Sequence, residues 1–128
     1  MIAIDTSSLV AFLQNEVAED VELIADGISK GMIVIPPIVI AEIFCARNIT
    51  KEAKESISRL PRLAIKDGYW ERTGEMRMEL LTAGKKARLA DTLIAAYCLD
   101  HDLEIVTRDD DYRHFSNHFG LKLIVSRV

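Results

Sequence analysis

The sequence predicts an α/β fold in which one parallel β-sheet of four to five strands is flanked by helices. Short β-branched segments alternate with longer segments whose apolar residues recur at helical spacing, which is the pattern of a parallel sheet with crossover helices. The chain has 128 residues, 49% of them apolar, a length that suits one compact core. We therefore expect a single domain that covers residues 1–128.

In the first half of the chain, each predicted strand leads into predicted helices. Strands are expected at residues 2–4 and 32–35, and helices at residues 9–13, 17–30, 38–47 and 50–60. Thr6, Ser7 and Ser8 offer caps for the first helix, Gly31 ends the second, and Pro37 suits the start of the third. In the second helix, Val21, Ile24, Ala25 and Ile28 are expected to be buried, whereas the acids of residues 19–22 are expected to be solvated.

The second half of the chain continues the alternation. Residues 63–65 are either a short strand or an extended link, and helices are expected at residues 69–83 and 88–100. A strand at residues 104–107 is followed by an aspartate triplet, a short helix with Phe115 and Phe119, and a last strand at residues 122–125. Tyr69 and Trp70 are interpreted as belonging either to an interface or to the core.

The charge and apolar patterns exclude several classes of protein. The net charge of −4, from 20 acidic and 16 basic residues, disfavours bulk electrostatic binding to nucleic acid or to anionic membranes. No apolar run approaches the ~20 residues of a membrane span, and no signal peptide is apparent, so we expect a soluble, cytoplasmic protein. Cys45 and Cys98 lie in apolar surroundings and are interpreted as buried free thiols.

Two acids directly follow predicted strands. Asp5 comes after the first strand and Asp109 after the strand at residues 104–107. In an open parallel sheet, ligands bind at the carboxyl ends of the strands, where these two side chains are expected. Asp5 is alternatively a helix N-cap, and Asp109 alternatively part of a solvated turn with Asp110 and Asp111.

Two other acids lie within apolar helical segments. Glu42 has Ile38, Val39, Cys45 and Ala46 as helical neighbours, and Asp91 shares a face with Ile94, Ala95 and Cys98. Both are therefore expected on buried faces, where an isolated carboxylate needs a cation, an arginine partner or a raised pKa. A structural salt bridge for Glu42 and an N-cap role for Asp91 are the alternatives.

A cluster of four carboxylates needs compensating positive charge. Two carboxylates ~4 Å apart repel by about 4 kcal/mol at an effective dielectric constant near 20. An all-oxygen set without paired His or Cys favours Mg²⁺ or Mn²⁺ over Zn²⁺, and these ions commonly serve phosphate chemistry. The sequence therefore predicts a divalent metal site built from Asp5, Glu42, Asp91 and Asp109.

Four segments carry a family resemblance that covers nearly the whole chain. They are Ile4-Asp5-Thr6-Ser7, Ala41-Glu42-Ile43, Ala90-Asp91-Thr92-Leu93-Ile94-Ala95-Ala96, and Val106-Thr107-Arg108-Asp109 with Asp111-Tyr112. In order and spacing they resemble a PIN domain and, within that superfamily, a VapC-type toxin. The resemblance implies a three-layer α/β fold and a Mg²⁺- or Mn²⁺-dependent ribonuclease with Asp5, Glu42, Asp91 and Asp109 as its acidic quartet. It also implies a homodimer and a small VapB-like antitoxin as partner.

Two positions depart from the family pattern or leave it ambiguous. The family often has Phe where this chain has Tyr112. The triplet of residues 109–111 leaves the last ligand open between Asp109 and Asp111; Asp109 lies nearer the strand end and is favoured, with Asp111 supporting it.

These residues suggest metal-assisted hydrolysis of an RNA phosphodiester. Asp5, Asp91 and Asp109 are expected to bind the metal directly, and Glu42 to hold a metal-bound water or a second ion. Supporting roles are expected for Thr6, Ser7 and Thr107, either in orienting ligands or as caps. Basic residues that bracket the acids in sequence are candidates for gripping RNA phosphates: Lys85, Lys86, Arg88, Arg108 and Arg113.

Other classes are weaker fits or remain alternatives. A haloacid-dehalogenase-like phosphatase needs a second Asp two residues after the first, where this chain has Ser7. His114 and His118 have the spacing of a helical metal pair but are interpreted as surface residues. A non-catalytic PIN-like module that binds RNA or protein, and a housekeeping RNA-processing nuclease, remain alternatives to a toxin.

Overall fold

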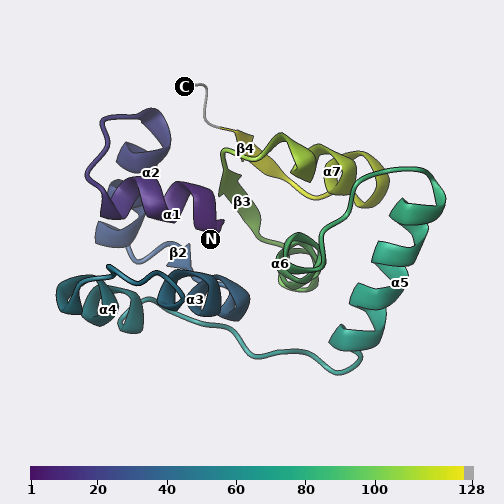
Figure 1. Cartoon of the computed structure of the whole chain (residues 1–128), viewed down its shortest axis with the longest axis horizontal. Coiled ribbons are helices and arrows are strands. Elements are labelled where there is room, and N and C mark those ends of the chain that lie inside the picture. The colour runs from purple at the N-terminus through teal and green to yellow at the C-terminus, as the bar shows by residue number, and fades with distance from the viewer. Residues whose placement is uncertain (126–128) are drawn as a thin grey trace.

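The computed structural model describes residues 1–125, and its centre is a parallel sheet (Figure 1). In this part of the chain the sheet has four strands in the order β2-β1-β3-β4. The strands are β1 (Ile2–Ile4), β2 (Ile33–Val34), β3 (Glu104–Thr107) and β4 (Leu123–Val125), all paired in parallel. The predicted parallel α/β fold is confirmed, and residues 63–65 form an extended link rather than a strand.

Helices fill the connections between the strands. They are α1 (Thr6–Leu13), α2 (Glu19–Ser29), α3 (Pro37–Phe44), α4 (Lys51–Ser58), α5 (Tyr69–Thr82), α6 (Leu89–Asp100), the 3₁₀ helix η1 (Asp110–Tyr112) and α7 (Arg113–Phe119). Pro37 is the first residue of α3, where its missing N–H costs nothing. The Thr50 side chain caps α4 by accepting a hydrogen bond from the Ala53 N–H at 3.0 Å.

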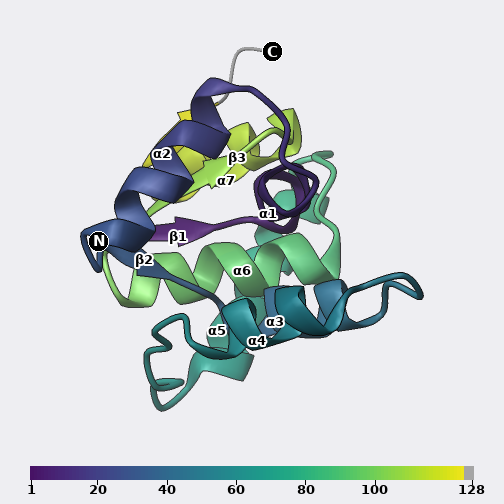
Figure 2. The same cartoon turned by 90° about the vertical axis from the view of Figure 1, so that its left-hand side faces the viewer.

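The elements form layers around the sheet. Figure 2 shows α2 on one side of β1 and α6 on the other, with α3, α4 and α5 beyond α6. The strands are buried from both sides, as expected for a parallel sheet between helices. Side chains with no exposed surface include Ala3, Ile4, Val34, Ile105 and Val106.

The strand register brings two parts of the predicted site together. Ile4 pairs with Val106, and the Asp5 N–H donates to the Val106 carbonyl at 3.0 Å. The chain leaves β1 and β3 at the same edge of the sheet, because neighbouring parallel strands have their carboxyl ends together. The chain leaves β1 toward β2 on one side and leaves β3 toward β4 on the other, so the switch point at which such sheets bind ligands lies between β1 and β3.

The structure decides several expectations about burial, and some of them were wrong. Cys45 is exposed, because α3 ends at Phe44 and Cys45 lies in its C-terminal cap; Cys98 is buried as predicted. Of the residues expected to be buried in α2, Ala25 and Ile28 are exposed and Val21 is half-buried, since the helix presents a face with Asp20, Ile24 and Gly27 to the core. Tyr69 lies in the core, whereas Trp70 is 59% exposed. Within residues 1–125, no helix combines the length and apolarity that crossing a membrane requires.

Candidate metal centre

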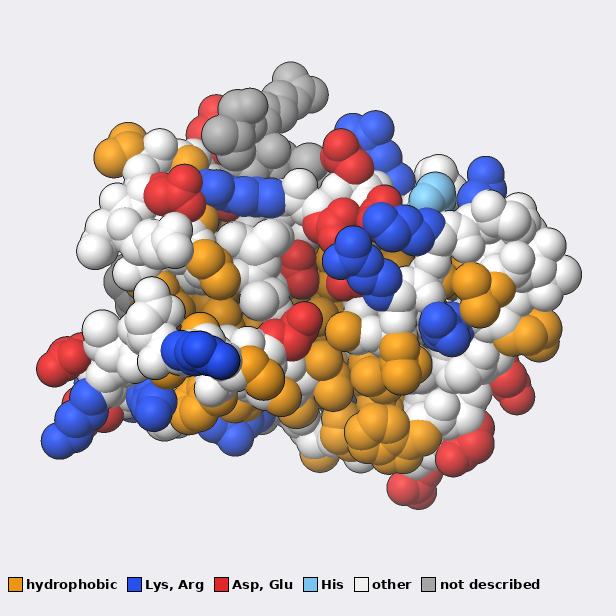
Figure 3. All heavy atoms as spheres, in the orientation of Figure 1, with side chains coloured by type: hydrophobic (Ala, Val, Ile, Leu, Met, Phe, Trp, Pro, Cys, Tyr) orange, Lys and Arg blue, Asp and Glu red, His pale blue; other side chains and the backbone are white. Residues whose placement is uncertain are grey.

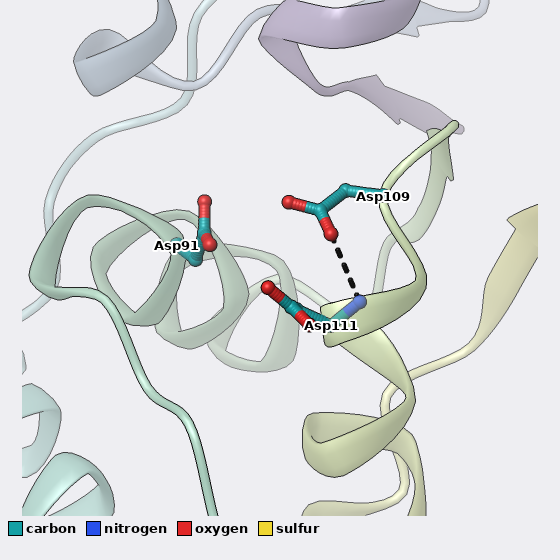
Figure 4. Close-up of side chains that lie close together, drawn as sticks. All are labelled: Asp91, Asp109 and Asp111. Carbon is teal, nitrogen blue, oxygen red and sulfur yellow. Dashed lines mark hydrogen bonds between the residues drawn. The ribbon is translucent and has the colours of Figure 1, made fainter.

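Three aspartates converge beyond the carboxyl ends of the central strands (Figure 4). Asp91 lies in the first turn of α6, Asp109 follows β3, and Asp111 lies in η1. One carboxylate oxygen from each lies within 4.8 Å of the others, and all three residues are half-buried. The side chain of Asp109 also caps η1, since its Oδ1 accepts a hydrogen bond from the Asp111 N–H at 2.9 Å. The cluster contains Asp111, which we expected in a supporting role.

The carboxylate of Asp91 has one buried oxygen atom whose hydrogen-bonding capacity is not satisfied by the described residues. Its Oδ2 is buried and has no hydrogen-bond partner among the described residues. Burial raises the pKa of Asp91 to about 6, and the nearby charges of Asp109, Asp5 and Glu42 act in the same direction, against a smaller opposing effect of Arg88. A buried carboxylate oxygen without a donor is costly unless a cation is bound or the group is protonated.

Asp5 is held in one orientation by three hydroxyl groups. Its Oδ2 accepts hydrogen bonds from Ser7 at 2.8 Å and from Thr107 at 2.7 Å. Its Oδ1 accepts one from Tyr112 at 3.0 Å. Asp5 precedes α1, but its side chain makes no capping hydrogen bond, so the N-cap alternative does not describe its role. The carboxylate is 5% exposed and its rotamer is fixed by residues from three segments.

Glu42 is exposed, and its predicted place on a buried face was wrong. In α3 the core-facing residues are Val39 and Ile43, so Glu42 points away from them. Its Oε1 accepts a hydrogen bond from the Thr6 hydroxyl at 2.6 Å. This bond ties α3 to the start of α1 and keeps Glu42 on the side of the acidic cluster, where its charge contributes to raising the pKa of Asp91.

The predicted basic residues divide into two groups. Lys85, Lys86, Arg88 and Arg113 are exposed. Lys86 Nζ lies 3.1 Å from Asp111 Oδ2, and Arg113 lies 3.6 Å from Asp110. Figure 3 shows acidic side chains near the middle of one face, with basic side chains beside them. This face has positive charge next to its acids despite the negative charge of the whole chain.

Arg108 is engaged within the protein. Its guanidinium donates to both carboxylate oxygens of Asp20, at 2.6 and 3.0 Å, and lies 3.3 Å from Glu16. Asp20 is only 2% exposed and also accepts a hydrogen bond from Ser8 at 2.9 Å. The hydrogen bonds from Arg108 are the main cause that lowers the pKa of Asp20. The pair joins α2 to the turn after β3, and the expectation that Asp20 is solvated was wrong.

Sequence reasoning missed two supports of the site. Asp20 lies at i, i+4 and i+7 spacing with Ile24 and Gly27, so helical periodicity could have placed it on the buried face. Tyr112 was noted only as a departure from the family pattern, although its wholly buried hydroxyl contacts Asp5. The sequence feature that could have identified Tyr112 is an aromatic residue with a hydroxyl group directly after the aspartate triplet, because a buried tyrosine hydroxyl usually finds a hydrogen-bond partner.

The donor set fits a hard divalent cation. Asp91, Asp109 and Asp111 offer carboxylate oxygens around one point, with Asp5 next to them through the hydroxyl of Tyr112. The orphaned Oδ2 of Asp91 and the repulsion among the carboxylates are both relieved by a bound cation. Oxygen ligands of this kind suit Mg²⁺ or Mn²⁺.

Comparison with known proteins places the chain in a family. The family model described as the PIN domain matches residues 2–117. Among curated proteins, none matches the chain in sequence.

Similar folds occur in solved toxin–antitoxin structures. VapBC2 from Rickettsia felis, bound to a DNA fragment from its promoter, contains a chain that is 23% identical, with a TM-score of 0.74 and 98% of each chain covered. DNA-bound VapBC from Salmonella typhimurium gives 24% identity and a TM-score of 0.72, with 97% of this chain and 96% of that chain covered. VapBC-5 from Mycobacterium tuberculosis gives 18% identity and a TM-score of 0.67, with 96% of each chain covered. At these identities the likeness shows a shared fold.

Proposed function

Because the chain belongs to the PIN domain family, we propose that it is a Mg²⁺- or Mn²⁺-dependent ribonuclease that hydrolyses RNA phosphodiester bonds. The observation that carries this proposal is the unpartnered Oδ2 of Asp91 within a group of three carboxylates. A purely structural cluster of acids is normally neutralised by basic side chains or hydrogen-bond donors. Here Lys86 pairs with Asp111, but the Asp91 oxygen has no donor among the described residues, which is the arrangement expected of a cation site.

Each acid has a distinct part in the proposed mechanism. Asp91 and Asp109 would hold the metal directly, and Asp5 would join them, while Asp111 supports Asp109 or supplies a further ligand. Glu42, anchored by Thr6, would hold a metal-bound water or a second ion. A cation bound by these residues would supply the activation of a water molecule and the stabilisation of charge on the phosphate. Ser7 and Thr107 donate hydrogen bonds to Asp5 Oδ2 and hold its carboxylate in one orientation.

The central test compares RNA cleavage by matched variants in the presence of Mn²⁺. Asp91→Asn and Asp109→Asn should each reduce the cleavage rate of mixed RNAs by about 100-fold or more, because each removes a ligand charge. Asp26→Asn is the control, since Asp26 is an exposed acid on α2 whose side chain pairs with Lys30 alone among residues 1–125. Circular dichroism and thermal melting establish that the variants fold. Full activity in both site variants would refute the assignment.

A non-catalytic module is the main alternative, and the same protein distinguishes it. Calorimetric titration with Mn²⁺ followed by incubation with RNA separates binding from cleavage. Metal binding without cleavage of any RNA tested would favour a scaffold that binds RNA or protein. Support for catalysis comes from Asp5, Asp91 and Asp109, which lie near one another beyond the ends of β1 and β3, and from Glu42, which Thr6 holds on the same side.

We further propose that the protein is the toxin of a toxin–antitoxin pair, with a small VapB-like antitoxin as its partner. Support comes from the fold it shares with chains of VapBC complexes. Expression in cells should arrest growth, and co-expression of the short reading frame next to its gene should relieve the arrest. Growth unaffected by expression of the active enzyme would favour a housekeeping RNA-processing nuclease.

We also propose that the protein forms a homodimer and is located in the cytoplasm. Trp70 on α5 is 59% exposed and Met78 on the same helix is 57% exposed, so apolar surface remains uncovered in the single chain. Light scattering of the purified protein measures its mass in solution directly. A mass of about 14.4 kDa, that of one chain, would contradict the homodimer.

A further inference from the structure

Tyr112 connects the acids that come from different parts of the fold. Its hydroxyl donates to Asp5 Oδ1 at 3.0 Å and lies 3.5 Å from Asp91 Oδ1. Its backbone N–H bonds to the Asp109 carbonyl at 3.3 Å. One residue thus contacts the acid after β1, the acid in α6 and the acid after β3.

The position of this hydroxyl is fixed by the packing of its ring and by the backbone of η1. The ring of Tyr112 is completely buried and packs against Phe115, with ring centroids 5.7 Å apart. Its backbone belongs to η1, which Asp109 caps. The phenol therefore cannot move away when the carboxylates repel one another. It has a single proton, and the shorter distance assigns that proton to Asp5, while the oxygen that lies beside Asp91 Oδ1 limits how closely the two carboxylates can approach each other.

We propose that Tyr112 is a positioning residue whose hydroxyl holds the Asp5 and Asp91 carboxylates at the separation that binds the divalent cation. The inference rests on the proposed metal site and deepens it. Groups that orient metal ligands commonly contribute 10- to 100-fold to metal affinity, because they spare the ligands an ordering cost when the ion binds. A phenylalanine at this position keeps the ring and its packing but leaves Asp5 Oδ1 without its donor.

The test is the affinity of the full chain for Mn²⁺, measured from the free ion by electron paramagnetic resonance. Tyr112→Phe should weaken Mn²⁺ binding by about 10-fold or more. At saturating Mn²⁺, its RNA cleavage rate should return to near that of the wild type, because the hydroxyl does not touch the reacting phosphate. The matched control is Tyr97→Phe, since Tyr97 is also buried but its hydroxyl, within the described part of the chain, bonds to the backbone of Leu63 and to no acid. The control should bind Mn²⁺ within about 2-fold of the wild type.

A second measurement needs no variant at the site. The chain has three tyrosines, so ¹³C labelling of the tyrosine Cζ atoms gives few NMR signals, and Mg²⁺ titration should shift the Tyr112 signal as the ion binds. The signal of Tyr97 should stay unchanged.

The outcomes separate this inference from the proposed function. Unchanged Mn²⁺ affinity in Tyr112→Phe would overturn the positioning role while leaving the metal site intact. A Tyr112 signal that does not respond to bound Mg²⁺ would do the same. Wild-type protein that binds Mn²⁺ but cleaves no RNA would refute the nuclease alone, and wild-type protein that binds no Mn²⁺ would refute both.

Discussion

Arg108 and Asp20, which are 88 residues apart in sequence, form an ion pair with two hydrogen bonds, whose N–O distances are 2.6 and 3.0 Å. The pair fastens α2 to the turn that carries Asp109. Its acid is almost completely buried, so removing Arg108 leaves a buried carboxylate without its cationic partner, whereas removing the Asp20 charge leaves Arg108 with only the longer contact to Glu16. The pair therefore contributes to stability beyond what an exposed ion pair provides.

Asp20→Asn should lower the melting temperature by about 5 to 10 °C at neutral pH, because the guanidinium of Arg108 loses its main charged partner. The interaction lowers the pKa of Asp20 in the folded state. Its stabilising effect is therefore present above the ordinary Asp pKa of 3.8 and is lost as the pH falls through the lowered value. Asp26→Asn is the control, since the Asp26–Lys30 pair is 61% exposed on both sides and should contribute little. Equal effects of the two variants in thermal melts would contradict this account.

Asp91→Asn should stabilise the metal-free protein at pH 7.5 by about 1 kcal/mol, because the folded state then no longer holds a buried, repelled charge. The pKa of Asp91 is raised from 3.8 to about 6 in the folded state. Protonated Asp91 therefore favours folding at low pH, and this contribution is lost as the pH rises through about 6. Urea unfolding in EDTA measures the difference, which should vanish near pH 4. A variant less stable than the wild type at pH 7.5 would show that the Asp91 charge is compensated within the protein.

The two cysteines should differ in reactivity toward a thiol reagent. Cys45 is exposed, whereas Cys98 has no exposed surface and burial raises the pKa of its thiol. Thiolates are the reactive form, so one thiol per chain should react with Ellman's reagent in the native state and the second only after unfolding. Native Cys45→Ser should not react. Rapid reaction of both thiols in native wild-type protein would contradict the buried position of Cys98.

The basic residues near the acids should govern the salt dependence of RNA binding. Changing both Lys85 and Arg88 to Ala should weaken binding and reduce the slope of log affinity against log salt by about 1.4, since each phosphate contact on a single strand contributes ~0.7. The measurement uses the inactive Asp109→Asn background to prevent cleavage. Lys51→Ala, at the exposed start of α4, is the control. An unchanged slope in the double variant would place the RNA elsewhere.

The local pattern of residues in the sequence was sufficient to predict most of the strands and helices. The β-branched segments at residues 2–4 and 104–107 became β1 and β3, and Pro37 and Thr50 marked the helix starts they were expected to mark. These features depend on neighbours a few positions apart, which a sequence displays directly. Burial was harder to predict: Glu42 is surrounded in sequence by apolar residues yet exposed, because only part of α3 faces the core.

The sequence alone was enough to single out Asp5, Asp91 and Asp109 as candidate metal ligands. The end of a predicted strand and an acid within an apolar helical segment can both be recognised from the order of residues along the chain. Only the tertiary structure decided how they meet. It brought Asp111 into the cluster, left Asp91 Oδ2 without a partner, turned Arg108 toward Asp20, and placed the hydroxyl of Tyr112 between Asp5 and Asp91. The physical reason is that these contacts join segments 20 to more than 100 residues apart, and their distances follow from how helices pack on the sheet rather than from spacing along the chain.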